Sequence, residues 1–64
     1  MRLGTVVDVP NEYSRFGTIK DSYGVRYTIA QGQMPDKIEK GDQVAYKVEI
    51  WANDSGLAYG VKKA

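Results

Sequence analysis

A regular alternation of apolar and polar side chains from Gln43 to Trp51 is the feature that most restricts the fold of this chain. The apolar positions are Val44, Tyr46, Val48 and Ile50, and between them lie Gln43, Ala45, Lys47 and Glu49. Successive side chains of a β-strand point to opposite faces, so the pattern predicts a strand with one buried face and one face in water. Such a strand needs neighbouring strands to form a stable sheet.

Four further segments have a similar character, and turn residues separate them. They cover residues 2–9, 15–21, 25–30 and 57–61. Seven Val, four Ile, three Thr and five Tyr favour strands, whereas seven Gly and two Pro interrupt them. No window of about a dozen residues has helical spacing, and residues 36–40 form at most one helical turn, started by Asp36. We therefore expect an all-β domain of about five short strands.

The size and composition of the chain exclude several classes of protein. Its 64 residues have room for a single domain, 1–64, and the absence of cysteine and histidine excludes disulfides, zinc fingers and Cys–His or Ser–His catalytic pairs. Scattered carboxylates and the lack of a glycine-rich phosphate loop lead us to expect no enzyme, no catalytic residue, no metal and no cofactor. With no long apolar run and no signal peptide, we expect a cytoplasmic monomer without membrane contacts.

The charge balance gives little direction, because nine Lys and Arg oppose eight Asp and Glu, a net charge of +1. A strongly basic domain would indicate nucleic-acid binding, and this one is not strongly basic. All three arginines nevertheless lie in the first half of the chain, and Arg15 and Arg26 each precede an aromatic residue.

Strand number and spacing together point to a small barrel. About five short strands, with the longest break between the third and the fourth, are the layout of an OB-type barrel. A small SH3-like barrel has a similar strand count and remains the alternative. Gly17 interrupts the second strand, which predicts a close backbone approach at that position.

Several stretches resemble the cold-shock domain family over nearly the whole chain. Gly4 to Val6 resembles the family's opening Gly-x-Val strand, and Ser14 to Ile19 stands where its Lys-Gly-Phe-Gly-Phe-Ile motif belongs. Val25 to Ile29 takes the place of its Val-Phe-Val-His motif, and Ile38 to Val44 resembles its Leu-x-x-Gly-x-x-Val stretch. Gly56, Ala58 and Val61 resemble its closing strand. The resemblance implies a five-stranded antiparallel OB-fold barrel that binds single-stranded RNA or DNA.

The binding face departs further from the family pattern than the framework does. Asp8 stands where the family has a tryptophan, and Thr18 stands where it has its second phenylalanine. The phenylalanine of the second motif corresponds to Arg26 or Tyr27 here, and its histidine to Thr28 or Ile29. A carboxylate at position 8 repels phosphate, unless Arg15 or Arg26 pairs with it. The stacking surface is therefore thinner than the family's.

We expect Phe16 to be the main stacking residue, because the family places this phenylalanine outside the barrel. An exposed aromatic ring stacks on the face of any base, and neighbouring cations neutralise phosphates. Arg15, Lys20 and Arg26 are the candidate cations. Tyr13, in the loop before the motif, is a candidate to lean over a base.

The position of Tyr27 is left open, because a slip of one residue exchanges the two faces of its strand. In one register Val25, Tyr27 and Ile29 face the core and Arg26 and Thr28 face a ligand, whereas in the other Tyr27 joins the stacking surface. We expect the other large aromatics to be structural: Tyr46 and Tyr59 in the core, Trp51 at the barrel rim and Tyr23 in a turn.

The sequence thus favours a protein that binds single-stranded RNA or DNA weakly, with little sequence specificity, and acts as an RNA chaperone. The alternative is a protein–protein interaction module on the same barrel, centred on Trp51 or Tyr59, that has lost nucleic-acid binding. A small-molecule-binding barrel is a third possibility, for which no pocket motif is visible.

Overall fold

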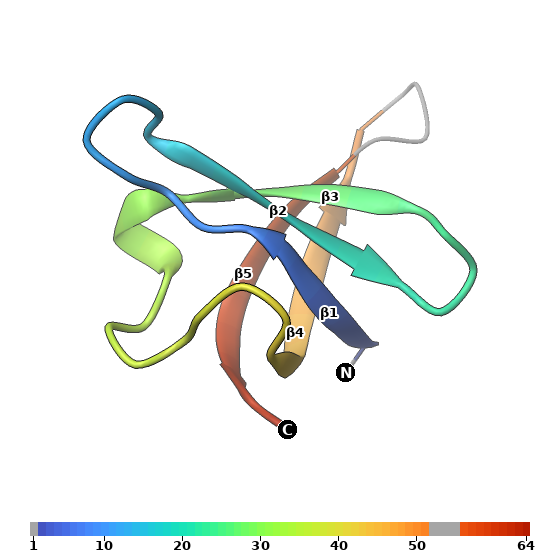
Figure 1. The fold of residues 1–64 in the computed structure, drawn as a ribbon. Coiled ribbons are helices and arrows are strands. Elements are labelled where there is room, and N and C mark those ends of the chain that lie inside the picture. Colours follow the sequence, from blue (N-terminus) through green and yellow to red (C-terminus); the bar gives the residue numbers. More distant parts are fainter. Residues whose placement is uncertain (1, 52–55) are drawn as a thin grey trace.

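A computed structural model describes residues 2–51 and 56–64, and its framework is five β-strands (Figure 1). They are β1 (Arg2–Asp8), β2 (Phe16–Asp21), β3 (Arg26–Ala30), β4 (Gln43–Ile50) and β5 (Gly56–Lys63). The all-β prediction is confirmed, but β5 continues to Lys63, past the expected end at residue 61. Residues 36–40 contain turns only, and a 3-10 helix, η1 (Gln31–Gln33), directly follows β3 instead. No helix among these residues is long and apolar enough to span a membrane.

The strands close into a barrel in the order β1-β2-β3-β5-β4, with β1 paired to both β2 and β4. This arrangement agrees with the expected OB-type barrel. The expectation that all pairs are antiparallel is wrong at one seam, because β3 and β5 run parallel, with Thr28 opposite Leu57 and Ile29 opposite Ala58. The reason is geometric: strand directions cannot alternate at every pair around a closed ring with an odd number of strands.

Inward-facing side chains from all five strands fill the barrel, as the alternation in the sequence predicts. The core consists of Val6, Ile19, Tyr27, Ile29, Ile38, Val44, Tyr46, Ala58 and Val61. The rings of Tyr27 and Tyr46 lie 5.9 Å apart between centroids and are tilted by 56°. Burial, helped by the charge of Asp21, raises the pKa of Tyr46 to about 12. Its hydroxyl is buried and has no hydrogen-bond partner among the described residues.

Gly17 confirms the predicted close approach of two backbone segments. A Cβ atom at this position would lie 2.5 Å from the carbonyl oxygen of Asp8 and 2.8 Å from Cδ of Pro10. The end of β1 therefore packs directly on the backbone of β2. The pairing of β1 with β2 also shifts register between Val6 and Asp8, so Val7 forms a bulge there.

A second bulge decides the orientation of Tyr59. The pairing of β4 with β5 shifts register between Ala45 and Lys47, and Gly60, at φ +61°, supplies the extra residue of β5. Val61 consequently faces the core, whereas Tyr59 lies outside with 41% of its surface exposed. The prediction of Tyr59 as a core residue is wrong, because a strict alternation places Tyr59 and Val61 on one face.

Candidate nucleic-acid interface

The outer surface of β2 and β3 gathers most of the residues that the sequence singled out. Ile19, Tyr27 and Ile29 point into the barrel, so the alternate positions point outward. The cross-strand pairs are Phe16 with Ala30, Thr18 with Thr28, and Lys20 with Arg26. We call the outward side chains of Phe16, Thr18, Lys20, Arg26 and Thr28 the β2–β3 face.

Phe16 lies at one end of this face and exposes 57% of its surface to solvent. A phenylalanine is among the residues most often buried, and an exposed ring at the start of a strand contributes little to the core. Arg15 immediately precedes it and is also exposed. The expected exposure of Phe16 is thus confirmed, and its neighbour in the sequence is an exposed cation.

The loop between β1 and β2 is held by local hydrogen bonds. The side-chain carbonyl Oδ1 of Asn11 accepts from the backbone N–H of Tyr13 at 2.7 Å and from that of Ser14 at 2.9 Å. The Ser14 hydroxyl donates in turn to the backbone carbonyl of Phe16 at 3.1 Å. These bonds form an Asx turn that leads into β2. Tyr13 is 90% exposed on this hydrogen-bonded loop, three residues before Phe16 in the sequence.

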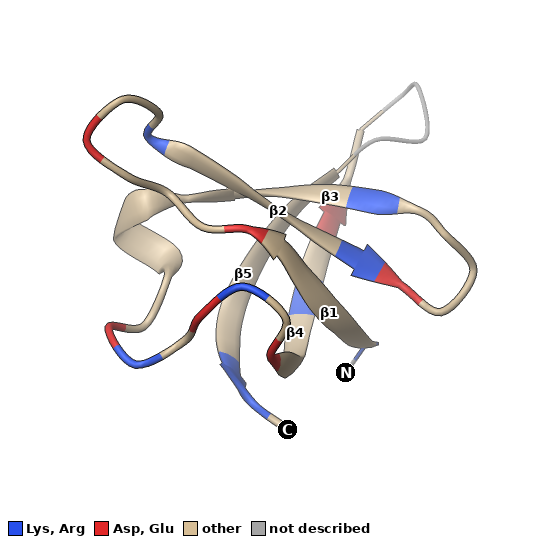
Figure 2. Ribbon diagram, viewed as in Figure 1, with Lys and Arg blue, Asp and Glu red and all other residues tan. Residues whose placement is uncertain are grey.

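The opposite end of the β2–β3 face is positively charged. Lys20 and Arg26 are directly opposite each other in the β2–β3 ladder, and both are exposed (Figure 2). Like charges in this position destabilise a sheet, so the pair is not explained by the stability of the fold. Within residues 2–51 and 56–64 the ion pair formed is that of Lys63 with Asp42, at 3.6 Å. Lys20 and Arg26 thus remain available for an anionic ligand.

Tyr27 does not belong to the β2–β3 face, and the prediction of a stacking role for it is wrong. Only 3% of its surface is exposed, because its ring packs against Tyr46 in the core. Its hydroxyl accepts a hydrogen bond from Arg2 Nη1 at 3.1 Å and lies 3.5 Å from Asp21 Oδ2. Of the two registers left open, the structure has the one in which Arg26 and Thr28 face outward.

Asp8 borders the face, opposite Thr18 on the neighbouring strand. Its carboxylate is exposed and forms no ion pair with Arg15 or Arg26 in the described part of the chain. The negative charge therefore stands uncompensated at the edge of the face, midway between the ring of Phe16 and the cations.

Further exposed aromatic residues lie in the β2–β3 turn and on the β4–β5 side of the barrel. Tyr23, 90% exposed, occupies the β2–β3 turn, and Trp51, 46% exposed, follows β4. Trp51 was expected at the barrel rim, and nearly half of its surface is in solvent. Together with Tyr59 and Ile50, Trp51 gives the β4–β5 side of the barrel several exposed apolar residues.

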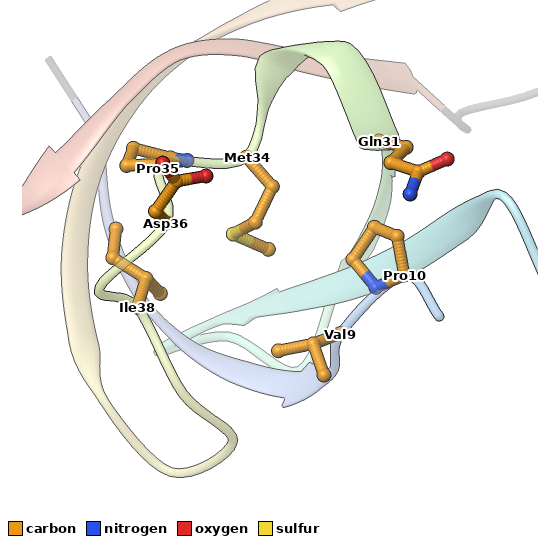
Figure 3. Close-up of a pocket in the computed structure, with 7 residues that line it drawn as sticks. All are labelled: Val9, Pro10, Gln31, Met34, Pro35, Asp36 and Ile38. Carbon is orange, nitrogen blue, oxygen red and sulfur yellow. The ribbon is translucent and has the colours of Figure 1, made fainter. Parts of the chain in front are cut away.

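A solvent-accessible cavity was not foreseen from the sequence. Its lining comes from the end of β1, η1 and the connection to β4: Val9, Pro10, Gln31, Met34, Pro35, Asp36 and Ile38 (Figure 3). These segments are distant in the sequence and carry no shared motif, so only the closure of the barrel brings them together.

A scan of the chain against models of known protein families gives no match, and a search of curated proteins finds no relative.

Proposed function

We propose that this protein binds single-stranded RNA or DNA on the β2–β3 face. The observation that carries the proposal is the exposed ring of Phe16, with Arg15 beside it and the Lys20–Arg26 pair on the same face. Base stacking on an exposed ring contributes about 1–3 kcal/mol per base and is tolerant of sequence. The cations then follow the phosphates, so binding has low sequence specificity.

The mechanism needs no movement of the barrel. One base stacks on Phe16 while Tyr13, on its ordered loop, approaches from the side. The strand then runs along β2 toward Lys20 and Arg26, where its phosphates are neutralised. A base stacked in this way cannot pair with a complementary strand, so binding would hold RNA hairpins open, as an RNA chaperone does.

The small net charge of +1 sets the expected strength of this binding. Three phosphate contacts, from Arg15, Lys20 and Arg26, predict a slope of about −2 for log K against log salt concentration on a single strand. The uncompensated carboxylate of Asp8 lowers the affinity further. We therefore expect weak binding that is measurable at low salt.

The test is a fluorescence anisotropy titration of labelled oligo(U) and oligo(dT) at low and at raised salt. Phe16→Ala is expected to weaken binding about tenfold or more, because one stack is lost. Trp51→Ala is the matched control, since it removes an exposed aromatic residue that follows β4, a strand that pairs with β1 and β5. Its affinity for the oligonucleotide should stay at the wild-type value.

The exposed apolar residues on the β4–β5 side favour a second candidate function, a protein-interaction module. Tyr59, Trp51 and Ile50 are each 41% or more exposed, and aromatic residues are enriched at protein interfaces. The same titration separates the two functions. Absence of oligonucleotide binding at low salt, or equal loss in Phe16→Ala and Trp51→Ala, contradicts the proposal for the β2–β3 face.

A further inference from the structure

The cavity at the end of the barrel carries a further inference. It measures about 310 Å³, which is at the lower end of the range for small-ligand sites. It exists because the connection from β3 to β4 contains only the three residues of η1 as helix, which leaves the barrel end incompletely covered. Val9 and Met34 are half-buried and pack against the core, so apolar side chains form part of the floor, while polar atoms make up the larger part of the exposed lining.

The polar groups of the cavity lie on its rim. Gln31 and Asp36 stand on opposite sides of Met34, whose side chain projects into the space between them (Figure 3). Neither polar side chain forms a hydrogen bond or ion pair within residues 2–51 and 56–64. One rim thus offers a carboxylate acceptor and the other an amide, next to the apolar side chains of Val9 and Met34.

This chemistry suits a flat ring with hydrogen-bonding edges and disfavours a phosphate. No Lys or Arg lines the cavity, and the carboxylate of Asp36 repels an anion. A carboxylate accepts well from an exocyclic amine, as in the pairing of Asp with the N4 amine of cytosine. The amide of Gln31 can donate to a ring nitrogen or carbonyl on the far edge of the same ring. Met34, which is flexible and polarizable, adapts to the face of the ring.

The cavity also adjoins the end of the β2–β3 face that carries Phe16. Phe16 is opposite Ala30, and the next residue, Gln31, donates its backbone N–H to the carbonyl of Arg15 at 2.8 Å. A strand with one base stacked on Phe16 therefore brings its neighbouring nucleotide to the mouth of the cavity. This continuity identifies the occupant as part of the same ligand.

We propose that the cavity is a base pocket, which takes one nucleobase of the bound strand and prefers bases with an exocyclic amine, such as cytosine and adenine. The preference over uracil and thymine comes from Asp36, and the apolar side chains of Val9 and Met34 hold the ring. The inference rests on the proposed function, because the base belongs to the strand on the β2–β3 face. The pocket would then supply the preference for certain bases, while stacking on Phe16 supplies affinity that does not depend on the base.

Free nucleosides test the pocket without the strand. The chain has two methionines, so protein labelled with methyl-¹³C methionine gives few signals, and Met34→Leu identifies that of Met34. Cytidine and adenosine at millimolar concentration are expected to shift the Met34 methyl signal. Uridine and inosine, which replace the amine by a carbonyl, should shift it far less. Equal shifts from all four nucleosides, or none from any, overturn the proposal.

The role of Asp36 is tested by a matched pair of variants. Asp36→Asn removes the carboxylate of the pocket, and Glu39→Gln removes the same charge from an exposed residue outside the cavity lining. Asp36→Asn should abolish the difference between cytidine and uridine, while Glu39→Gln keeps it. An unchanged difference in Asp36→Asn contradicts the assignment of the carboxylate.

Oligonucleotides separate failure of the pocket from failure of the proposed function. Oligo(dC) is expected to bind about tenfold more tightly than oligo(dU), and Asp36→Asn should bring the two together. Equal affinities with a silent Met34 signal overturn the pocket and leave the β2–β3 face intact. A nucleoside-dependent Met34 signal without any oligonucleotide binding overturns the β2–β3 face, and with it the claim that the base belongs to a bound strand.

Discussion

The inward and outward faces of β2 and β3 contribute differently to the stability of the protein, although both faces belong to the same two strands. Inward, Ile19, Tyr27 and Ile29 are at most 3% exposed and form part of one continuous core. Outward, Phe16 exposes an aromatic ring, and Lys20 faces Arg26 across the ladder. The inward face gains stability from burial, whereas the outward face gives up stability to an exposed ring and a like-charge pair.

Under the proposed function, this contrast divides the residues of a very small barrel between folding and binding. A chain of this length has a free energy of unfolding of roughly 3–10 kcal/mol, at about 0.05–0.15 kcal/mol per residue. It therefore tolerates few unfavourable positions. Those on the β2–β3 face are the features that a binding role explains and a purely structural role does not. Substitutions on the two faces should accordingly have separable effects on stability and on binding.

Ile29→Ala is expected to have the largest effect on stability. Ile29 is fully buried at the centre of β3, and truncation of a buried isoleucine costs about 2–5 kcal/mol. Urea denaturation followed by circular dichroism measures the loss. Thr28→Ala, the adjacent outward position, is the control and should change stability by less than about 0.5 kcal/mol. Similar losses in both variants would contradict the division between the two faces.

Gly17→Ala should come next, because its effect arises from the backbone rather than from a side chain. The new methyl group would lie 2.5 Å from the carbonyl of Asp8, so β1 and β2 have to separate. A forced shift of this kind costs about 1–3 kcal/mol. Gly32→Ala is the control, since a Cβ at Gly32 meets nothing within 4 Å. Thermal unfolding of the two variants compares them, and equal stability would show that the close approach is not required.

Much of this division was predictable from the sequence, and the exceptions have physical causes. The alternation in β4 identified Val44 and Tyr46 as buried, but it was wrong for Ile50, which is 53% exposed, and for Ala45, which is buried. The glycine in β2 correctly indicated a close approach. The register of β3 was left open, because the phenylalanine of the family motif corresponds to either Arg26 or Tyr27 and a slip of one residue exchanges the two faces. Tyr59 was misplaced because the Gly60 bulge breaks the alternation, and a bulge cannot be read from a local pattern.

The candidate functional residues likewise divide into those that the sequence predicted and those that it did not. Phe16, Arg15 and Tyr13 were found by resemblance and by residue type, and all are exposed. The cavity between Gln31 and Asp36 was not found, because its lining joins segments that meet only when the barrel closes. A residue's chemistry is visible in the sequence, but the pairing of distant segments is not.

Lys20→Gln tests the outward face of β2 and β3 for its effects on stability and on oligonucleotide binding. Removing one member of the like-charge pair should raise the stability of the fold by a few tenths of a kcal/mol. It should also weaken oligonucleotide binding at low salt and reduce the salt slope by about 0.7, the share of one phosphate contact on a single strand. Lys47→Gln, on the exposed side of β4, is the matched control and should leave both the affinity and the slope unchanged. A loss of stability in Lys20→Gln would mean that Lys20 supports the fold.

Tyr46→Phe should have the smallest effect at neutral pH, even though Tyr46 is fully buried. The substitution keeps the ring in the core and removes a hydroxyl that has no partner among the described residues, so stability should be unchanged or slightly raised. Loss of more than about 1 kcal/mol would instead show that the hydroxyl is hydrogen-bonded, for example to a buried water molecule.

Alkaline pH then distinguishes the variant from the wild type. Burial raises the pKa of Tyr46 from 10.0 to about 12 in the folded protein. Between these two values the unfolded chain releases this proton while the folded chain retains it, so the stability contributed by the neutral hydroxyl is present below pH 10 and is lost as the pH rises toward 12. Tyr46→Phe lacks the titrating group and should lose less stability than the wild type over that window. Urea denaturation at pH 9 and pH 11 measures the difference, and parallel losses would show that the hydroxyl titrates normally. Such a result would mean that water reaches the inward face of the barrel, and the contrast between its two faces would be weaker than the burial indicates.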